Sequence, residues 1–240
     1  MTGFDVIRRF FGVFFFLILF LASSAQAGEL PFEPGERILY NIKQFGVKVG
    51  DADLKFAGTK KLSDGRDASL IIFTSHAPNF FDEEKIYVNP SNFSPLRVER
   101  NLNIWGKKEK ITEEYLTAEG KIKIAKISNG TTTEQVLVKK GVIDNIYGFI
   151  YRYRSQGKFD AGEQFSVNLP TKDVVIKIAD EMSFNADGKT YQAILMTSVP
   201  SRYSIWMDKS EKRLPLRISG AVGLANTVMT MVGVEEDKNQ

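Results

Sequence analysis

Apolar and polar residues alternate with a period of two through most of this chain, in short stretches that end at glycine or at turn-forming pairs. The first stretch has Ile38, Tyr40 and Ile42 as its apolar positions, and the alternation resumes after Phe45-Gly46. Such alternation is typical of β-strands with one buried face, and an interrupting glycine is typical of a hairpin turn. The chain is therefore expected to fold mainly as β-structure.

Turn signals such as Asn129-Gly130 and Asp187-Gly188 separate the later stretches, because these residues tolerate the positive φ of tight turns. The acidic run at 82–84 is interpreted as a solvated loop. About a dozen short strands with few other elements indicate a mostly β fold, a curved antiparallel sheet or open half-barrel in one domain. Further strands are predicted over residues 69–75, 96–104, 108–116, 121–128, 134–139, 164–169, 174–184, 191–198, 203–208, 214–220 and 224–231.

One segment, residues 144–154, departs from this pattern. Its apolar residues Ile146, Phe149, Ile150 and Tyr153 follow the i, i+3, i+4, i+7 spacing of an amphipathic helix. Asp144 or Asn145 can cap the start of the helix, and Gly157 can end it. The sequence predicts one short helix that packs its aromatic face on the sheet.

The N-terminal residues 1–27 have the pattern of a signal peptide. Two arginines precede an apolar run at 10–22, which is shorter than the roughly 20 residues that a membrane-spanning helix needs. Ala25 and Ala27 are the small residues that a signal peptidase reads, so cleavage is expected before Gly28. The alternative is an uncleaved N-terminal anchor.

Export across the inner membrane, to the periplasm, is therefore expected. Residues 28–240 would form a single β-rich domain with a short polar C-terminal tail and no membrane span. The chain has no cysteine, so neither a lipid anchor at the cut nor a disulfide is expected.

Composition excludes several chemistries. Without cysteine there is no thiol nucleophile and no thiolate metal site, and the only histidine, His76, excludes sites that need two. The sequence assigns no catalytic residue, no metal ligand and no cofactor. With 32 Lys and Arg against 29 Asp and Glu, there is no basic excess that would indicate nucleic-acid binding. A pair of carboxylates acting in hydrolysis remains open.

Aromatic residues suggest a binding function. Trp105, Tyr203 and Trp206 are candidates for lining a concave apolar face, as in open barrels that hold lipids or other amphiphiles. The alternative is that these side chains fill an ordinary core.

Three parts of the chain together resemble a family of exported bacterial proteins known only as a domain of unknown function, DUF3108. They are the opening FEPGERILY at 32–40 with the hairpin at 45–52, the helical segment at 144–154, and the tryptophan-containing hairpin at 205–218. The resemblance implies a β-rich domain of the periplasm or cell envelope, similar to the half-barrels of lipoprotein-handling proteins. It implies no catalytic residues.

These observations lead to a hypothesis of function. The chain is expected to be a non-enzymatic periplasmic or cell-envelope protein that binds a lipid, a polysaccharide or an envelope protein. The alternative is a periplasmic hydrolase that uses a carboxylate pair.

Overall fold

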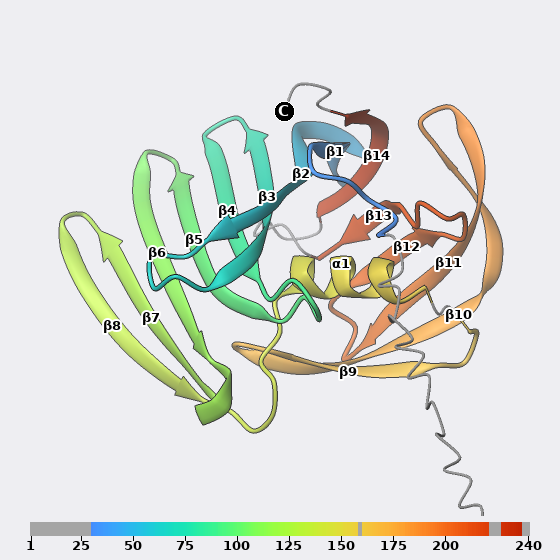
Figure 1. Ribbon diagram of the computed structural model, residues 1–240. Coiled ribbons are helices and arrows are strands. Elements are labelled where there is room, and N and C mark those ends of the chain that lie inside the picture. The colour runs from blue at the N-terminus through green and yellow to red at the C-terminus, as the bar shows by residue number, and fades with distance from the viewer. Residues whose placement is uncertain (1–29, 158–159, 221–226, 237–240) are drawn as a thin grey trace, which may run out of the picture.

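A computed structural model describes residues 30–157, 160–220 and 227–236. Over these residues the chain forms one antiparallel sheet of fourteen strands, with one α-helix and one short 3-10 helix (Figure 1). The first half contains β1 (Glu36–Gln44), β2 (Val47–Lys61), β3 (Asp67–Ala77), β4 (Phe80–Val88), β5 (Pro95–Ile104), β6 (Lys107–Leu116), the 3-10 helix η1 (Thr117–Glu119), β7 (Lys121–Ser128) and β8 (Thr131–Val138). The second half contains α1 (Ile146–Gln156), β9 (Gln164–Leu169), β10 (Lys172–Ala186), β11 (Lys189–Val199), β12 (Ser204–Asp208), β13 (Pro215–Ser219) and β14 (Thr227–Glu236).

The sheet consists of two meanders joined in the middle by β1 and β14. The strand order is β8-β7-β6-β5-β4-β3-β2-β1-β14-β13-β12-β11-β10-β9, so strands β1–β8 form a first wing and strands β9–β14 a second. In the central pair Ile38 faces Val234 and Tyr40 faces Met231. The sheet is not closed, because β8 and β9 are its two edges. The predicted curved antiparallel sheet is confirmed.

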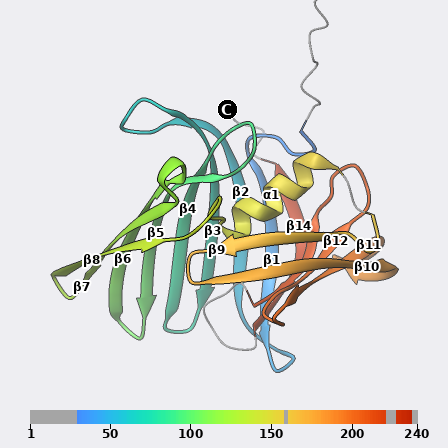
Figure 2. The ribbon, with the colours of Figure 1, turned by 90° about the horizontal axis from the view of Figure 1, so that it is seen from below.

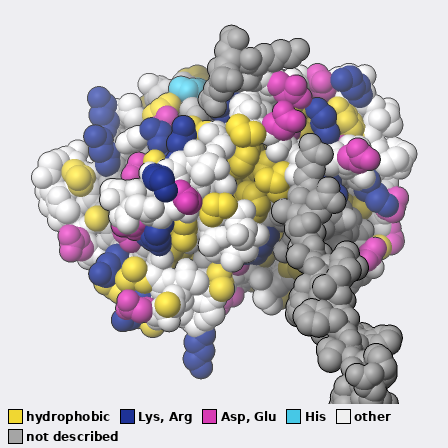
Figure 3. All heavy atoms as spheres, viewed as in Figure 1, with side chains coloured by type: hydrophobic (Ala, Val, Ile, Leu, Met, Phe, Trp, Pro, Cys, Tyr) yellow, Lys and Arg dark blue, Asp and Glu magenta, His cyan; other side chains and the backbone are white. Residues whose placement is uncertain are grey.

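Helix α1 lies across the concave side of the sheet (Figures 1 and 2). The alternation in β1 places Ile38, Tyr40 and Ile42 on one face of the sheet, where all three are buried in the same core as the helix. On the side seen in Figure 1, hydrophobic side chains gather between the two wings and charged ones lie around them (Figure 3). The aromatic residues of α1 and the buried residues of both wings form one core.

The predicted helix is confirmed at α1, and its ends are capped as the sequence indicated. The Asn145 side chain accepts hydrogen bonds from the backbone N–H groups of Tyr147 and Gly148. Gly148 has low helix propensity, but it allows close packing here, because a Cβ would lie 3.2 Å from the carbonyl oxygen of Phe93. At the other end Gly157 takes the left-handed conformation, with φ 71°.

The prediction of a solvated loop at residues 82–84 is wrong. These residues lie within β4, where Asp82 is only 1% exposed. A carboxylate is tolerated there because Arg100 of the neighbouring strand β5 binds it through two nitrogens.

Both ends of the predicted domain organisation fall partly outside the described residues. The predicted signal peptide, residues 1–27 with the cleavage positions Ala25, Ala27 and Gly28, lies wholly outside the described residues. Strand β14 extends into the predicted polar tail as far as Glu236. Among the described residues, no helix has the length and apolar character needed to cross a bilayer.

Candidate functional site

A pocket of about 880 Å³ lies between the end of β8 and the β9–β10 hairpin, where the two edges of the sheet approach each other. We call it the edge pocket. It is lined by residues 138–142, 166–168 and 173–175, together with Asp144, Arg152 and Val199.

The surface of the edge pocket is more apolar than polar, and its apolar side chains are all valines. Val167 and Val174 are buried and belong to the core. Val138, Val142 and Val199 are instead 71%, 46% and 50% exposed. Covering an apolar side chain removes its surface from water and lowers the free energy of the complex, so the exposed valines favour binding of an apolar ligand.

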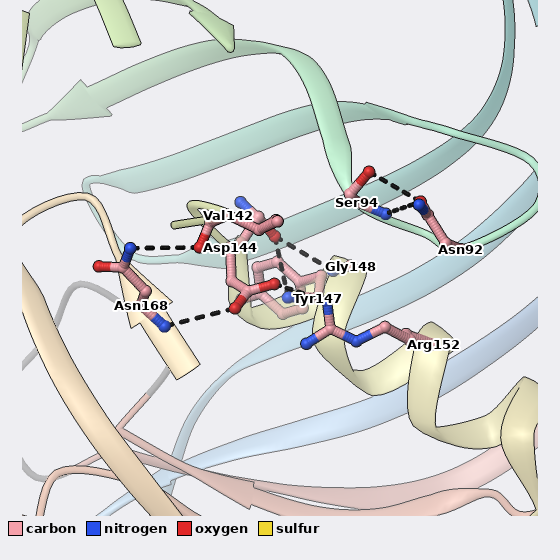
Figure 4. A network of polar contacts seen from close by, with 9 residues as sticks. Asn92, Ser94, Val142, Asp144, Tyr147, Gly148, Arg152 and Asn168 are labelled. Carbon is pink, nitrogen blue, oxygen red and sulfur yellow. Dashed lines mark hydrogen bonds and ion pairs between the residues drawn. The ribbon is translucent and has the colours of Figure 1, made fainter. Parts of the chain in front are cut away.

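A polar network holds the segment after β8 against β9 (Figure 4). The backbone N–H of Asp144 donates to the carbonyl oxygen of Asn168 at 2.7 Å. The Asp144 side chain accepts from Arg152 Nη1 at 2.7 Å and from the backbone N–H of Asn168 at 3.3 Å. Asn168 Nδ2 donates to the carbonyl oxygens of Lys140 at 2.9 Å and Val142 at 3.2 Å. The network fixes the pocket wall before any ligand binds.

Three cations and two carboxylates line the same pocket. Arg152 pairs with Asp144, as described above, and Lys139 Nζ lies 2.7 Å from Asp173 Oδ1. The remaining cation, Lys140, is exposed. The polar part of the edge pocket is therefore net positive.

A second group of polar side chains lies on the concave face of the first wing. This inner cluster consists of Asp82, Glu84, Arg100, Glu113 and Tyr115. Arg100 Nε and Nη2 donate to the two Asp82 oxygens at 2.7 and 2.5 Å, and Arg100 Nε lies 3.4 Å from Glu84 Oε1. The Tyr115 hydroxyl donates to Glu113 Oε2 at 2.6 Å. Asp82 and Glu84 thus share one arginine, while Glu113 is bound by a tyrosine.

Burial changes the protonation of the inner cluster. Loss of water around Glu84 raises the pKa of its carboxyl from 4.5 to about 7, against the opposing effects of Arg100 and of the Asn145 side chain. The same cause raises the pKa of Glu113. Because Asn145 caps α1 and also donates to Glu84, the cluster connects the start of the helix to the sheet.

The three predicted ligand-lining residues do not lie together. Trp105 is 79% exposed at the β5–β6 turn, on the first wing. Tyr203 and Trp206 belong to the second wing, where the Trp206 ring stacks on Phe184 at 4.9 Å. Its strand neighbours are buried, so Trp206 points to the convex face. Lys172 Nζ lies 5.1 Å from the Tyr203 ring centre.

The residues of the edge pocket were not predicted. Val138 ends a strand in which Val136 has the same orientation and is also exposed, so the pattern does not distinguish a pocket residue from its neighbour. The pocket depends on contact between β9 and the segment that follows β8, which no local signal indicates. Within the described part of the chain, no group of three or more His, Asp or Glu side chains is arranged to hold a metal ion.

The fold and the edge pocket define an open, barrel-like β-protein with one internal helix. Residues 39–232 match the family described as "Protein of unknown function (DUF3108)". The match covers most of the chain, so the protein belongs to the DUF3108 family, as the sequence predicted.

The fold is similar to that of a protein of known structure. A solved structure, described as a beta-barrel-like protein of domain of unknown function DUF1849 from Brucella abortus, is similar with a TM-score of 0.49 and 7% identity. The similarity covers 84% of this chain and 97% of that one. A search of curated proteins gave no significant match.

Proposed function

We propose that the protein is a non-enzymatic cell-envelope protein that binds the apolar chain of an anionic amphiphile in the edge pocket. The observation that carries this proposal is the pocket itself, about 880 Å³ in volume with exposed valines contributed by both edge regions of the sheet. Small-molecule sites typically have volumes of about 300–1,000 Å³ and mainly apolar walls. Covering each half-exposed valine would contribute about 1 kcal/mol.

The charges favour an anionic head group. Lys139 and Arg152 are paired with Asp173 and Asp144, so their charges cancel. The exposed Lys140 beside the valines leaves the lining with a net positive charge. A polysaccharide fits this wall less well, because valine side chains offer no hydrogen bonds to sugar hydroxyls. An envelope protein as the ligand is disfavoured by the concave shape of the pocket.

Replacing Val138 by aspartate tests this proposal. The variant is expected to weaken binding of a fluorescent fatty acid, 11-(dansylamino)undecanoic acid, by about tenfold or more, because a carboxylate would meet the apolar chain and repel the head group. Val136→Asp is the matched control, since Val136 is exposed on the same strand but does not line the pocket. Equal binding by the two variants, or no binding by the wild type, would contradict the proposal. Lipid extraction of protein purified from cells, with native mass spectrometry, would identify the natural ligand.

The proposed location in the periplasm is supported by the basic, apolar and small-residue pattern of residues 1–27. Mass spectrometry of protein from a periplasmic fraction is expected to give a chain that begins at Gly28. A mass that includes residues 1–27 would contradict cleavage, and protein confined to the cytoplasm would contradict export.

Hydrolysis by paired carboxylates is a second candidate function. The observation that favours it is Glu84, whose pKa of about 7 is suitable for a general acid near neutral pH. Against it, Arg100 binds both oxygens of the neighbouring carboxylate, Asp82. A hydrolytic activity found in the purified protein and lost in Glu84→Gln would favour this function over binding.

A further inference from the structure

Four hairpins of the first wing turn at the same end of the sheet. They connect β1 to β2, β3 to β4, β5 to β6 and β7 to β8, and they form the lower edge in Figure 2. The strand register agrees, since Asp51 near the first turn faces His76 near the second, and Phe80 faces Ile104 at the third. We call this edge the hairpin rim.

Two of these turns carry an exposed aromatic residue where such a residue is unfavourable. Phe45 and Trp105 are 81% and 79% exposed, and their φ values are 49° and 53°. Each precedes a glycine that also has positive φ. The left-handed region disfavours side chains other than those of Asn and Asp, and water disfavours exposed aromatic rings.

The chain uses the favourable residues at comparable turns. Asn129 precedes Gly130 in the β7–β8 turn with φ 51°, and Asp187 precedes Gly188 in the β10–β11 turn with φ 49°. Neither turn geometry nor folding therefore explains the aromatic rings at Phe45 and Trp105.

Lysines accompany both aromatic residues. Lys43 and Lys48 face each other across the first hairpin, just below Phe45. Lys107 and Lys108 directly follow the Trp105 turn. The nearest acids stand further along the strands, where Asp51 lies 2.6 Å from Lys48 Nζ and Glu109 lies 3.2 Å from Lys107 Nζ. Each turn thus presents an aromatic ring with two lysines behind it.

This combination matches the surface of a bilayer that contains anionic lipid. Aromatic rings are favoured at the level of the head groups, and lysines near the surface are attracted to anionic lipids. Four strand spacings separate the two hairpins, so the rings lie about 19 Å apart along the sheet. Two contacts at this distance would orient the rim toward a flat surface.

We propose that the hairpin rim docks on a bilayer surface rich in anionic phospholipid. Phe45 and Trp105 enter the head-group region, and Lys43, Lys48, Lys107 and Lys108 lie against the phosphates. The proposal is independent of the edge pocket, which is formed by other residues.

Vesicles of phosphatidylglycerol and phosphatidylethanolamine in equal parts test this proposal. The double variant Phe45→Asn/Trp105→Asn is expected to bind them one to two orders of magnitude more weakly than the wild type, since each ring contributes apolar contact area. Asparagine suits the left-handed turn, so thermal unfolding should occur at the same temperature or higher. Val136→Asn, which removes an exposed apolar side chain away from the rim, is the control and should bind as the wild type does.

Fluorescence distinguishes insertion from other contacts. The chain has two tryptophans, so Trp206→Phe leaves Trp105 as the only one. Its emission is expected to shift to shorter wavelength with the anionic vesicles, and much less with vesicles of phosphatidylcholine alone. The proposal is overturned if there is no shift, or if the double variant binds as strongly as the wild type. Sedimentation that shows a dimer lost in the double variant would assign the rings to a protein interface and overturn it as well.

Discussion

The Arg154→Met variant is expected to unfold with a free energy about 3–5 kcal/mol lower than that of the wild type, because it leaves a buried carboxylate without its partner. Arg154 is fully buried and binds Glu36 through Nη1 at 2.7 Å and Nη2 at 3.0 Å. Its Nη2 also donates to the carbonyl oxygen of Lys212 at 3.0 Å. Its guanidinium lies 4.7 Å from the Phe32 ring centre and 5.2 Å from that of Tyr151. Denaturation in urea measures the change.

Arg37, which follows Glu36 in the sequence, provides a matched control. Its ion pair with Asp53, 2.9 Å long, is on the surface, and Arg37→Met is expected to change the free energy of unfolding by less than about 1 kcal/mol. The double variant Glu36→Gln/Arg154→Met should recover much of the loss, because no charge then remains buried. Arg154 lies in α1 and Glu36 in β1, so the buried pair links the helix to the sheet. If Arg154→Met were no more destabilising than Arg37→Met, this link would contribute little to stability.

The Glu84→Gln variant is expected to be more stable than the wild type by roughly 3 kcal/mol above neutral pH and nearly equal to it in mild acid. The pKa of Glu84 is about 7 in the folded protein, against 4.5 ordinarily. Between these values the folded chain holds a proton that the unfolded chain has released. The contribution of Glu84 to stability is therefore present below pH 4.5 and is lost as the pH rises to about 7.

Denaturant unfolding near pH 5 and near pH 8 measures this difference. Glu99→Gln on β5 serves as a control, since Glu99 pairs with Arg97 on a more exposed part of the sheet. If the two variants and the wild type changed equally with pH, Glu84 would not titrate as we infer, and its proposed role as an acid in hydrolysis would also lose support.

Most strands and the helix were predictable because their signals are local. Period-two alternation identified β1 and its neighbours, and the spacing of Ile146, Phe149 and Ile150 identified α1. Strand β4 was missed because two of its acidic residues, Asp82 and Glu84, are buried against Arg100, which is distant in sequence. Local polarity alone could not indicate that partner.

The candidate sites were less predictable than the fold. Trp105 was expected inside the sheet, but it follows the last residue of β5 directly, and the turn directs it to solvent. The edge pocket forms between strands that are joined by α1 and not by a hairpin. The sequence shows which residues are apolar, whereas the meeting of the two edges depends on the curvature of the whole sheet.

The central pairing of β1 with β14 has a consequence for how the protein folds. Each wing is a meander whose neighbouring strands are also neighbours in sequence, so its contacts close short loops. The pair that unites the wings joins Ile38 with Val234, almost the whole domain apart. Contacts between such distant segments form slowly, because the entropy cost of closing a long loop comes before the favourable contact energy. We therefore expect the two wings to assemble early and the half-barrel to be completed late, when the last strand of the chain pairs with the first.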